Sequence, residues 1–446
     1  MKVTAEDVQR RYASLPDEEL LLLNRDDLTE LARPCYDAEL RRRGLMEPEP
    51  EPAPLAVATF ADPNSAALAR QVLRSAGIEC FPENCDDGVR LMAPARRVNE
   101  ARGLLEEDED AAPPPKRWDG AIAHRFAETN GIRMHYAEAG TGPLVILCHG
   151  FPECWYSWRH QLPALASEGY RVVAPDLRGF GQTDRPQAAE AYDILQLTGD
   201  LVGLVNALGE GAAILVGHDW GAMLAWHAAL LRPKLFRALV LMSVPYVPRR
   251  KVSQSQWEAE TYPGKIFYQA DLRSPRAEAF FESDIRTHLL RGLWLLSGDA
   301  PPDKRWRTVR DPDSPPATPA LPARLPRWLT EADLDFLEGE YRRTGFSGGL
   351  NCYRNCDRNW ELTPFLEGSQ LLQPTLFLAG EKDPVLDFLG EELAALKINV
   401  PNLWKKALIP RAGHWIQQER PEDVNLLLTD FLHEIEPSAS QLAVSA

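Results

Sequence analysis

The sequence predicts an α/β protein in which a mostly parallel sheet, covered by helices on both faces, carries a helical cap. From residue 123 onward, apolar β-type runs such as 144–148, 170–176 and 238–244 alternate with helical segments. This alternation is typical of a parallel sheet that is buried on both sides. About a quarter of the chain separates the run at 238–244 from the next one at 375–379, and it is helical and rich in Trp and Tyr. That separation is too long for a connection and predicts a cap domain.

Composition places the chain among ordinary globular proteins and excludes some partners. Its 446 residues leave room for two or three domains, and 44% hydrophobic with 26% charged residues is a usual balance. The net charge of -16 and the pI near 5.1 argue against nucleic acid or an anionic membrane as a partner. We find neither a signal peptide nor a membrane-spanning window, which predicts a cytoplasmic protein. No oligomeric state follows from the sequence.

The first part of the chain is expected to hold a helical hairpin and an extended linker. Residues 1–46 predict the hairpin, because a helix-start pattern at 14–19 is followed by leucines at helical spacing and by basic residues before Gly44. Residues 47–54 alternate Glu with Pro and predict a linker that is neither helix nor strand.

Residues 55–107 predict a small α+β module, and the acidic and Pro-rich residues 108–118 predict a second linker. The module reads as strand, helix, two strands and a closing helix. These five elements are expected at 56–60, 63–75, 77–81, 89–93 and 95–105.

The remaining chain is predicted to form a core, a cap and a tail. The core is expected at 119–245 and 366–436, the helical cap at 246–365, and the tail at 437–446.

The motif Gly-His-Asp-Trp-Gly at residues 217–221 is the chemical centre of the sequence. It follows an apolar β-type run and precedes an Ala-rich helical segment, so it is typical of a nucleophile elbow. The residue at its tip is Asp219. A carboxylate displaces a leaving group from saturated carbon and forms an alkyl ester, whereas a serine would form an acyl-enzyme. The motif therefore predicts a substrate with a C–O or C–halogen bond to be opened.

A histidine and an acid follow the elbow in the order that such folds use. Asp383 comes directly after a predicted strand, and His414 stands in the last loop before the C-terminal helix. His414 is expected to activate water against the Asp219 ester, while Asp383 orients its ring. Glu381 and Asp387 are neighbouring carboxylates that could replace Asp383.

Two backbone N–H groups are expected to stabilise the oxyanion that forms on Asp219 during ester hydrolysis. One belongs to Trp220 and the other to Phe151. We expect no metal and no cofactor, because no phosphate-binding loop occurs and the spacing of Cys352 and Cys356 is not that of a metal or redox pair. The loop of Phe151 is expected to be positioned and braced by His149, Gly150 and Pro152.

These motifs resemble the α/β-hydrolase-fold epoxide hydrolases from residue 123 to the C-terminal helix. The matching stretches are 149–153, 217–221, 380–383 and 413–415. The resemblance implies the α/β-hydrolase fold and a hydrolase acting on ether bonds, which opens a small epoxide with water to a vicinal diol. It also implies a detoxification role.

The resemblance further implies two tyrosines of the cap that donate hydrogen bonds to the epoxide oxygen. The run Leu-Asn-Cys-Tyr-Arg-Asn at 350–355 resembles the second lid-tyrosine motif and points to Tyr353. Phe-Tyr-Gln at 267–269 resembles the first and points to Tyr268, although Leu272 and Arg273 stand where the family has Phe-Gln.

Through its first strand, the run Leu-Arg-Ser-Ala-Gly-Ile at 73–78 and the closing segment 98–105, the module at 55–107 resembles small bacterial signal-transducing-protein modules. The resemblance implies a non-catalytic binding, docking or regulatory role, and a purely structural role is the alternative that stays open. For the main domain two alternatives stay open. A haloalkane or haloacetate dehalogenase would share the Asp nucleophile but needs halide donors rather than two phenols. A non-catalytic regulator would keep the hydrolase fold without its activity.

Overall fold

The computed structural model describes residues 4–45, 53–60, 66, 69–70, 73–74, 77–85, 87–106, 120–314, 321–322 and 324–435. The chain divides into two compact units, Met1–Asp110 and Ala111–Ala446, with the division inside the predicted linker at 108–118. That linker, residues 47–52 of the first linker, most of the predicted helix at 63–75 and the predicted tail lie outside the described residues.

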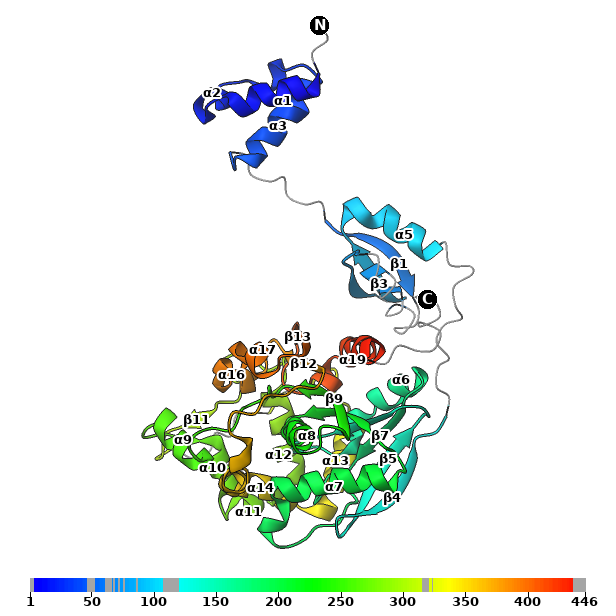
Figure 1. The fold of residues 1–446 in the computed structure, drawn as a ribbon, viewed down its shortest axis with the longest axis vertical. Helices are drawn as coiled ribbons and strands as arrows, with labels where there is room; N and C mark the ends of the chain where they lie inside the picture. Colours follow the sequence, from blue (N-terminus) through cyan, green and yellow to red (C-terminus); the bar gives the residue numbers. More distant parts are fainter. Residues whose placement is uncertain are drawn as a thin grey trace. The chain divides into compact units, whose positions relative to one another are not determined.

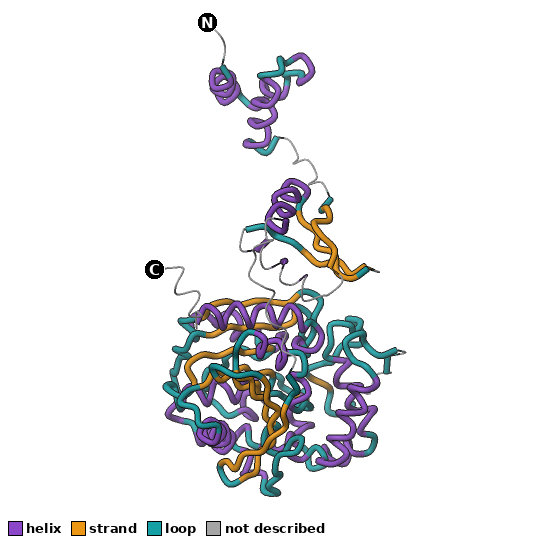
Figure 2. The backbone as a smooth tube through the Cα atoms, turned by 90° about the vertical axis from the view of Figure 1, so that its right-hand side faces the viewer, coloured by secondary structure: helices purple, strands orange, loops and turns teal. Residues whose placement is uncertain are grey.

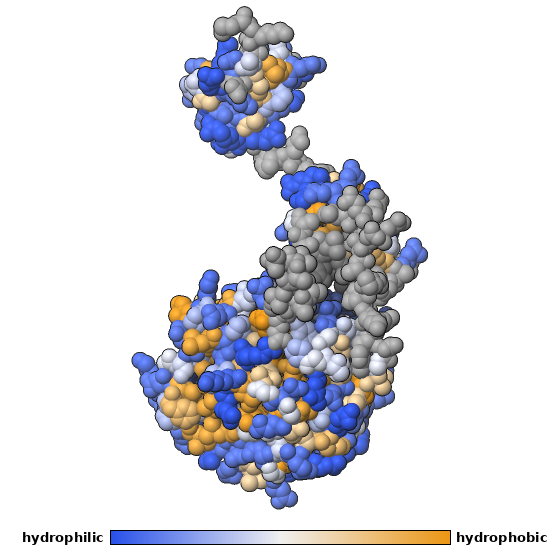
Figure 3. Space-filling view, turned by 45° about the vertical axis from the view of Figure 1, so that its right-hand side comes forward, coloured by the Kyte–Doolittle hydropathy of each residue, from blue (hydrophilic) through white to orange (hydrophobic). Residues whose placement is uncertain are grey.

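The first unit begins with helices that share a small core of their own. Within its described residues the segment contains one helix more than the predicted hairpin, because the capping box of Thr4 and Asp7 starts α1 before the predicted helix start at 14–19. Hydrophilic side chains dominate the visible face of these helices (Figure 3). The elements are α1 (Ala5–Ser14), α2 (Asp17–Leu21), η1 (Arg25–Asp27) and α3 (Ala32–Arg42). Their core includes Tyr12, Leu20, Tyr36 and Leu40.

An antiparallel three-stranded sheet in the order β1-β3-β2 follows in the same unit. Its strands and closing helices are β1 (Leu55–Phe60), β2 (Phe81–Cys85), β3 (Gly88–Ala93), η2 (Ala95–Arg97) and α5 (Val98–Glu106). The strand predicted at 77–81 is wrong. Gly77 has a positive φ, and the N–H of Ile78 donates to the carbonyl of Leu73, so both residues end the preceding turn instead.

The second unit is built on a sheet that has eight strands within the described residues (Figures 1 and 2). The order is β13-β12-β9-β8-β6-β7-β5-β4, and every pair is parallel except the two that involve β5. The predicted mostly parallel sheet is therefore confirmed. The strands are β4 (Ala123–Thr129), β5 (Ile132–Ala139), β6 (Leu144–Cys148), β7 (Arg171–Pro175), β8 (Ala213–His218), β9 (Phe236–Met242), β12 (Thr375–Gly380) and β13 (Leu403–Ile409).

Helices cover both faces of this sheet, as predicted. In one layer α6 (Gln161–Ser167) packs with α19 (Pro421–Ile435), and in the other α7 (Ile194–Ala207) packs with α8 (Trp220–Leu231) (Figure 1). The side of α8 toward β8 and β9 carries small buried residues, and these let the helix axis approach the strands closely. This close packing holds the start of α8 at the carboxyl end of β8.

The cap lies between β9 and β12 and is mainly helical. Its helices are α9 (Gln254–Thr261), α10 (Tyr268–Arg273), α11 (Ala277–Glu282), α12 (Ile285–Leu295), α13 (Glu331–Thr344), α14 (Ser347–Arg354) and α15 (Cys356–Leu362). A two-stranded sheet pairs β10 (Ile266–Phe267) with β11 (Val309–Arg310). Among the described residues, no helix is both long and apolar enough to cross a membrane.

Short helices complete the second unit. They are η4 (Trp155–Trp158), η5 (Ala189–Tyr192), η6 (Pro364–Leu366), η7 (Pro384–Phe388), α16 (Gly390–Ala394), α17 (Leu396–Asn399) and α18 (Ile416–Glu419).

Candidate active site

Asp219 stands at the junction of β8 and α8 in a backbone conformation that side chains rarely adopt. Its φ is 52° and its ψ is -118°, so the turn projects the carboxylate from the end of the sheet. The neighbouring loop approaches closely because Gly150 has no side chain. A Cβ atom at Gly150 would lie 2.4 Å from the Cβ of Asp219. The elbow and this loop are thus built around one carboxylate.

The loop supplies a hydrogen bond to that carboxylate. The backbone N–H of Phe151 donates to Oδ1 of Asp219 over 3.0 Å. Trp220 is the first residue of α8, so its N–H has no acceptor within the helix. The peptide bond between Phe151 and Pro152 is cis.

His149 ties the same loop to the end of β7. Its Nδ1 lies 2.8 Å from the carbonyl oxygen of Gly150, and the N–H of Leu177 donates to its Nε2 over 3.1 Å. One ring nitrogen therefore donates and the other accepts, so the ring is neutral. Burial also lowers the pKa of His149, which favours the neutral ring.

His414 lies between two carboxylates. Its Nδ1 is 3.0 Å from Oδ2 of Asp383, and its Nε2 is 3.6 Å from Oδ2 of Asp219. His414 and Asp383 are both buried, whereas Glu381 and Asp387 are exposed. Of the three candidate acids, the structure brings Asp383 to the imidazole.

The two carboxylates change the proton affinity of His414. Burial lowers its pKa, but the charge of Asp383 and the hydrogen bonds to Asp219 and Asp383 outweigh burial and raise the pKa to about 10. The imidazole is therefore charged at neutral pH while both carboxylates are ionised.

This charge predicts a pH dependence of stability. A histidine titrates near 6.5 in an unfolded chain, whereas His414 titrates at about 10 in the folded protein. The difference stabilises the fold fully below about pH 6.5, and this stabilisation is lost as the pH rises through 10. We expect the excess unfolding free energy of the wild type over His414→Gln to shrink by a few kcal/mol, on the order of 3, from about pH 7 to 10.5. Urea unfolding followed by tryptophan fluorescence measures it in the second unit, since no tryptophan precedes Trp118. A constant difference across this range would contradict the shift.

Two tyrosines of the cap, the buried Tyr353 and the partly buried Tyr268, complete the group around Asp219. Tyr268 begins α10 and Tyr353 lies in α14, and their ring centroids are 6.5 Å apart. The ring of Tyr353 also packs edge-on against that of Trp220 at 5.0 Å. Burial, and to a smaller extent the charge of Asp219, raise the pKa of both phenols. Both hydroxyl groups therefore keep their protons and can donate them.

A buried ion pair beneath the site was missed by the sequence analysis. Nδ1 of His218 is 2.7 Å from Oε2 of Glu153, and its Nε2 is 2.8 Å from the carbonyl oxygen of His414. Both partners only accept, so both ring nitrogens of His218 donate and the ring is charged. This charge lowers the pKa of Glu153 to about 2, although burial raises it. Oε2 of Glu153 also accepts from the N–H of Gly150 over 3.0 Å, which links the pair to the oxyanion loop.

A second missed carboxylate is Glu419, which is buried at the end of α18. The sequence feature that could have drawn attention to Glu419 is an unbroken polar run at 417–419, immediately before a helix. The sequence analysis assigned no role to that run.

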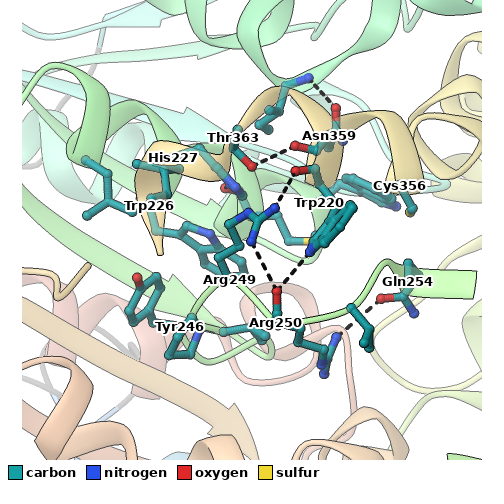
Figure 4. A pocket seen from close by; sticks show the side chains of 18 residues that line it. Trp220, Trp226, His227, Tyr246, Arg249, Arg250, Gln254, Cys356, Asn359 and Thr363 are labelled. Carbon is teal, nitrogen blue, oxygen red and sulfur yellow. Dashed lines mark hydrogen bonds between the residues drawn. The ribbon is translucent and has the colours of Figure 1, made fainter. Parts of the chain in front are cut away.

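A separate cavity of about 120 Å³ lies beside Trp220, between α8, α15 and the chain that leaves β9 (Figure 4). Neither Asp219 nor His414 lines it. At its rim Arg249 donates to the carbonyl oxygen of Trp360 over 3.1 Å, and the indole N–H of Trp360 donates to the carbonyl oxygen of Arg250 over 2.8 Å. These bonds fasten α15 to the beginning of the cap.

Comparisons with known proteins agree with this geometry. A family model described as alpha/beta hydrolase fold matches residues 143–421. Epoxide hydrolase A of Mycobacterium tuberculosis is 45% identical over 324 residues, which cover 71% of this chain and 99% of the relative. Epoxide hydrolase 3 of Siraitia grosvenorii is 41% identical, covering 70% of this chain and 99% of the relative.

Solved structures give the same assignment. An epoxide hydrolase from an endophytic Streptomyces is 43% identical with a TM-score of 0.67, covering 72% of this chain and 98% of that one. Epoxide hydrolase A from Mycobacterium thermoresistibile is 44% identical with a TM-score of 0.65, covering 70% of this chain and 98% of that one. The chain therefore belongs to the epoxide hydrolases of the α/β-hydrolase fold.

Proposed function

We propose that this enzyme opens an epoxide to a vicinal diol through an alkyl ester on Asp219. The observation that carries the proposal is the meeting of a carboxylate, a buried histidine–acid pair and two protonated phenols at one point. A dehalogenase would need donors suited to a halide, and an alkoxide leaving group needs acidic hydrogen-bond donors. The two phenols therefore favour the epoxide.

In the first half-reaction, Oδ2 of Asp219 attacks an epoxide carbon while Tyr268 and Tyr353 donate hydrogen bonds to the epoxide oxygen. Oδ1 is held by the N–H of Phe151, so Oδ2, which lies 3.6 Å from Nε2 of His414, is the nucleophile. The C–O bond of the ring breaks, and its oxygen takes a proton from a phenol. The product is a hydroxyalkyl ester of Asp219.

In the second half-reaction, water attacks Cγ of the ester. Formation of the ester removes one of the two negative charges that hold the proton on His414, so its pKa falls. That proton passes to the phenolate left by ring opening, which restores the phenol and leaves Nε2 as a neutral base. The oxyanion then forms on Oδ1, between the N–H groups of Phe151 and Trp220. The Cγ–Oδ2 bond then breaks, and the leaving diol oxygen takes the proton that Nε2 had accepted from water, while Asp383 stabilises the imidazolium in between. The proton left on the new Asp219 carboxyl group passes to Nε2, which restores the charged imidazole and the ionised carboxylate.

The remaining parts of the proposal concern the rest of the chain. We propose a cytoplasmic enzyme with a detoxification role, and a binding, docking or regulatory role for the module at 55–107. The assignment of 119–245 and 366–436 to the core and 246–365 to the cap rests on the helices and strands given above.

Styrene oxide and 1-chlorobutane separate the epoxide and dehalogenase activities. We expect diol from the first and no chloride from the second, and Asp219→Asn to lose activity because an amide is not a nucleophile. A single turnover in heavy-oxygen water should place the label in Asp219, as read by peptide mass spectrometry. Label in the diol alone would exclude the ester, and an active Asp219→Ala variant would exclude Asp219 as nucleophile.

A further inference from the structure

Glu419 is a buried carboxylate that accepts three backbone hydrogen bonds. Its Oε2 accepts from the N–H of Gly413 over 3.0 Å and from that of Gly298 over 2.9 Å. Its Oε1 accepts from the N–H of Trp415 over 3.0 Å. The side chain therefore joins the loop on both sides of His414 to a residue of the cap.

This role requires an ionised carboxylate. Hydrogen bonds to a charged acceptor are about twice as strong as neutral ones. Burial raises the pKa of Glu419 to about 7, and the three N–H groups act in the opposite direction. At pH 8 the group is therefore ionised and accepts all three bonds. A glutamine has the same shape, but its NH₂ group would face at least one of these N–H donors.

The backbone of the His414 loop is held at three successive N–H groups and at the carbonyl oxygen of His414. The N–H of His414 donates to the carbonyl oxygen of Leu296 over 2.8 Å, so the N–H groups of residues 413–415 all bind either Glu419 or the cap. The carbonyl oxygen of His414 accepts from Oγ of Ser243 over 2.8 Å. The chain of the cap passes so close that a Cβ atom at Gly413 would lie 2.3 Å from the N of Gly298.

The two half-reactions depend on this loop to different degrees. Ring opening uses Asp219 and two phenols, which stand on α8, α10 and α14 and make none of these bonds. Ester hydrolysis needs Nε2 of His414 to meet a water beside Cγ of Asp219 while Nδ1 stays on Asp383. A displacement of about 1 Å at such a group costs on the order of 10²-fold in rate.

We infer that Glu419 is a positioning residue for the hydrolytic half-reaction, holding His414 in place through the backbone of residues 413–415 and Gly298. The inference rests on the proposed ester mechanism. It assigns Glu419 no contact with the substrate.

Glu419→Gln in the full-length chain tests this role at pH 8. Rapid mixing with styrene oxide, acid quenching and mass spectrometry follow the ester and the diol separately. We expect ester formation to stay within about 2-fold of the wild type and ester decay to slow by about 10- to 100-fold, so that ester accumulates. Glu422→Gln is the matched control, because Glu422 is an exposed carboxylate three residues away, and it should change neither rate.

A merely structural role would give a different result. Loss of general stability would lower both rates together and leave their ratio unchanged, and that outcome would overturn the inference, as would unchanged ester decay. Diol formation by the wild type without any ester would instead contradict the proposed function, and the inference would fall with it.

Hydrogen exchange of the wild-type enzyme provides a second measurement if Glu419→Gln does not fold. The N–H groups of residues 413–415 should exchange as slowly as those of the buried strand β12. Rapid exchange at 413 and 415 would overturn the inference without any variant.

Discussion

Replacing His414 with alanine is expected to trap the enzyme as its Asp219 ester. The nucleophile, the N–H of Phe151 and both phenols remain, so styrene oxide still alkylates Asp219. Water then lacks its general base, whose contribution is about 10²- to 10⁴-fold. Diol formation should fall by at least that factor, while intact-mass spectrometry shows one equivalent of the adduct on the protein.

His433→Ala is the control for this variant. His433 lies in α19, where its Nε2 contacts Glu168 at 3.3 Å, and it contributes nothing to the site. It should turn over at the wild-type rate and accumulate no additional adduct. If His414→Ala released diol at the wild-type rate, His414 would not be the base.

Removing both phenols is expected to block ester formation, whereas removing His414 blocks ester hydrolysis. Each donor to a developing oxyanion contributes about 10²- to 10³-fold, so Tyr353→Phe and Tyr268→Phe should each lower ring opening by that factor. The double variant should form no detectable ester or diol, because the alkoxide would leave without a proton. Single-turnover ester formation is the measurement.

Tyr262→Phe serves as the matched cap variant, since this tyrosine stacks on Phe267 at 5.4 Å and is only partly buried. Its rate should stay within about 2-fold of the wild type. Accumulation of ester in the double variant would show that the phenols act after ring opening, contrary to the mechanism.

The sequence was most informative where chemistry depends on residue type and chain order. Asp219 at an elbow, followed by Asp383 after a strand and His414 in the last loop, could be predicted from general properties of the fold. Tyr353 and Tyr268 could not, because a cap tyrosine that packs has the same local sequence as one that donates a proton. They came from the resemblance to the family.

The buried polar pairs were out of reach for a different reason. Glu153, His218 and the carbonyl of His414 meet across three separate chain segments, and their spacing carries no periodic signal. The edge strand β13 was also missed, because it has one neighbour and exposes Lys405 and Lys406, so its pattern lacks the apolar run of the central strands.

The seam between Leu296–Gly298 and the His414 loop has a consequence for exchanging caps between relatives. A chimaera that grafts a foreign cap onto this core would keep both tyrosines if the donor supplies them. It would, however, replace Leu296 and Gly298, whose carbonyl oxygen and N–H group bind the N–H of His414 and the carboxylate of Glu419 here. A change of cap made to alter the substrate range would therefore also alter turnover. A graft boundary that leaves residues 293–298 with the recipient should retain more hydrolysis than one drawn at the ends of the cap.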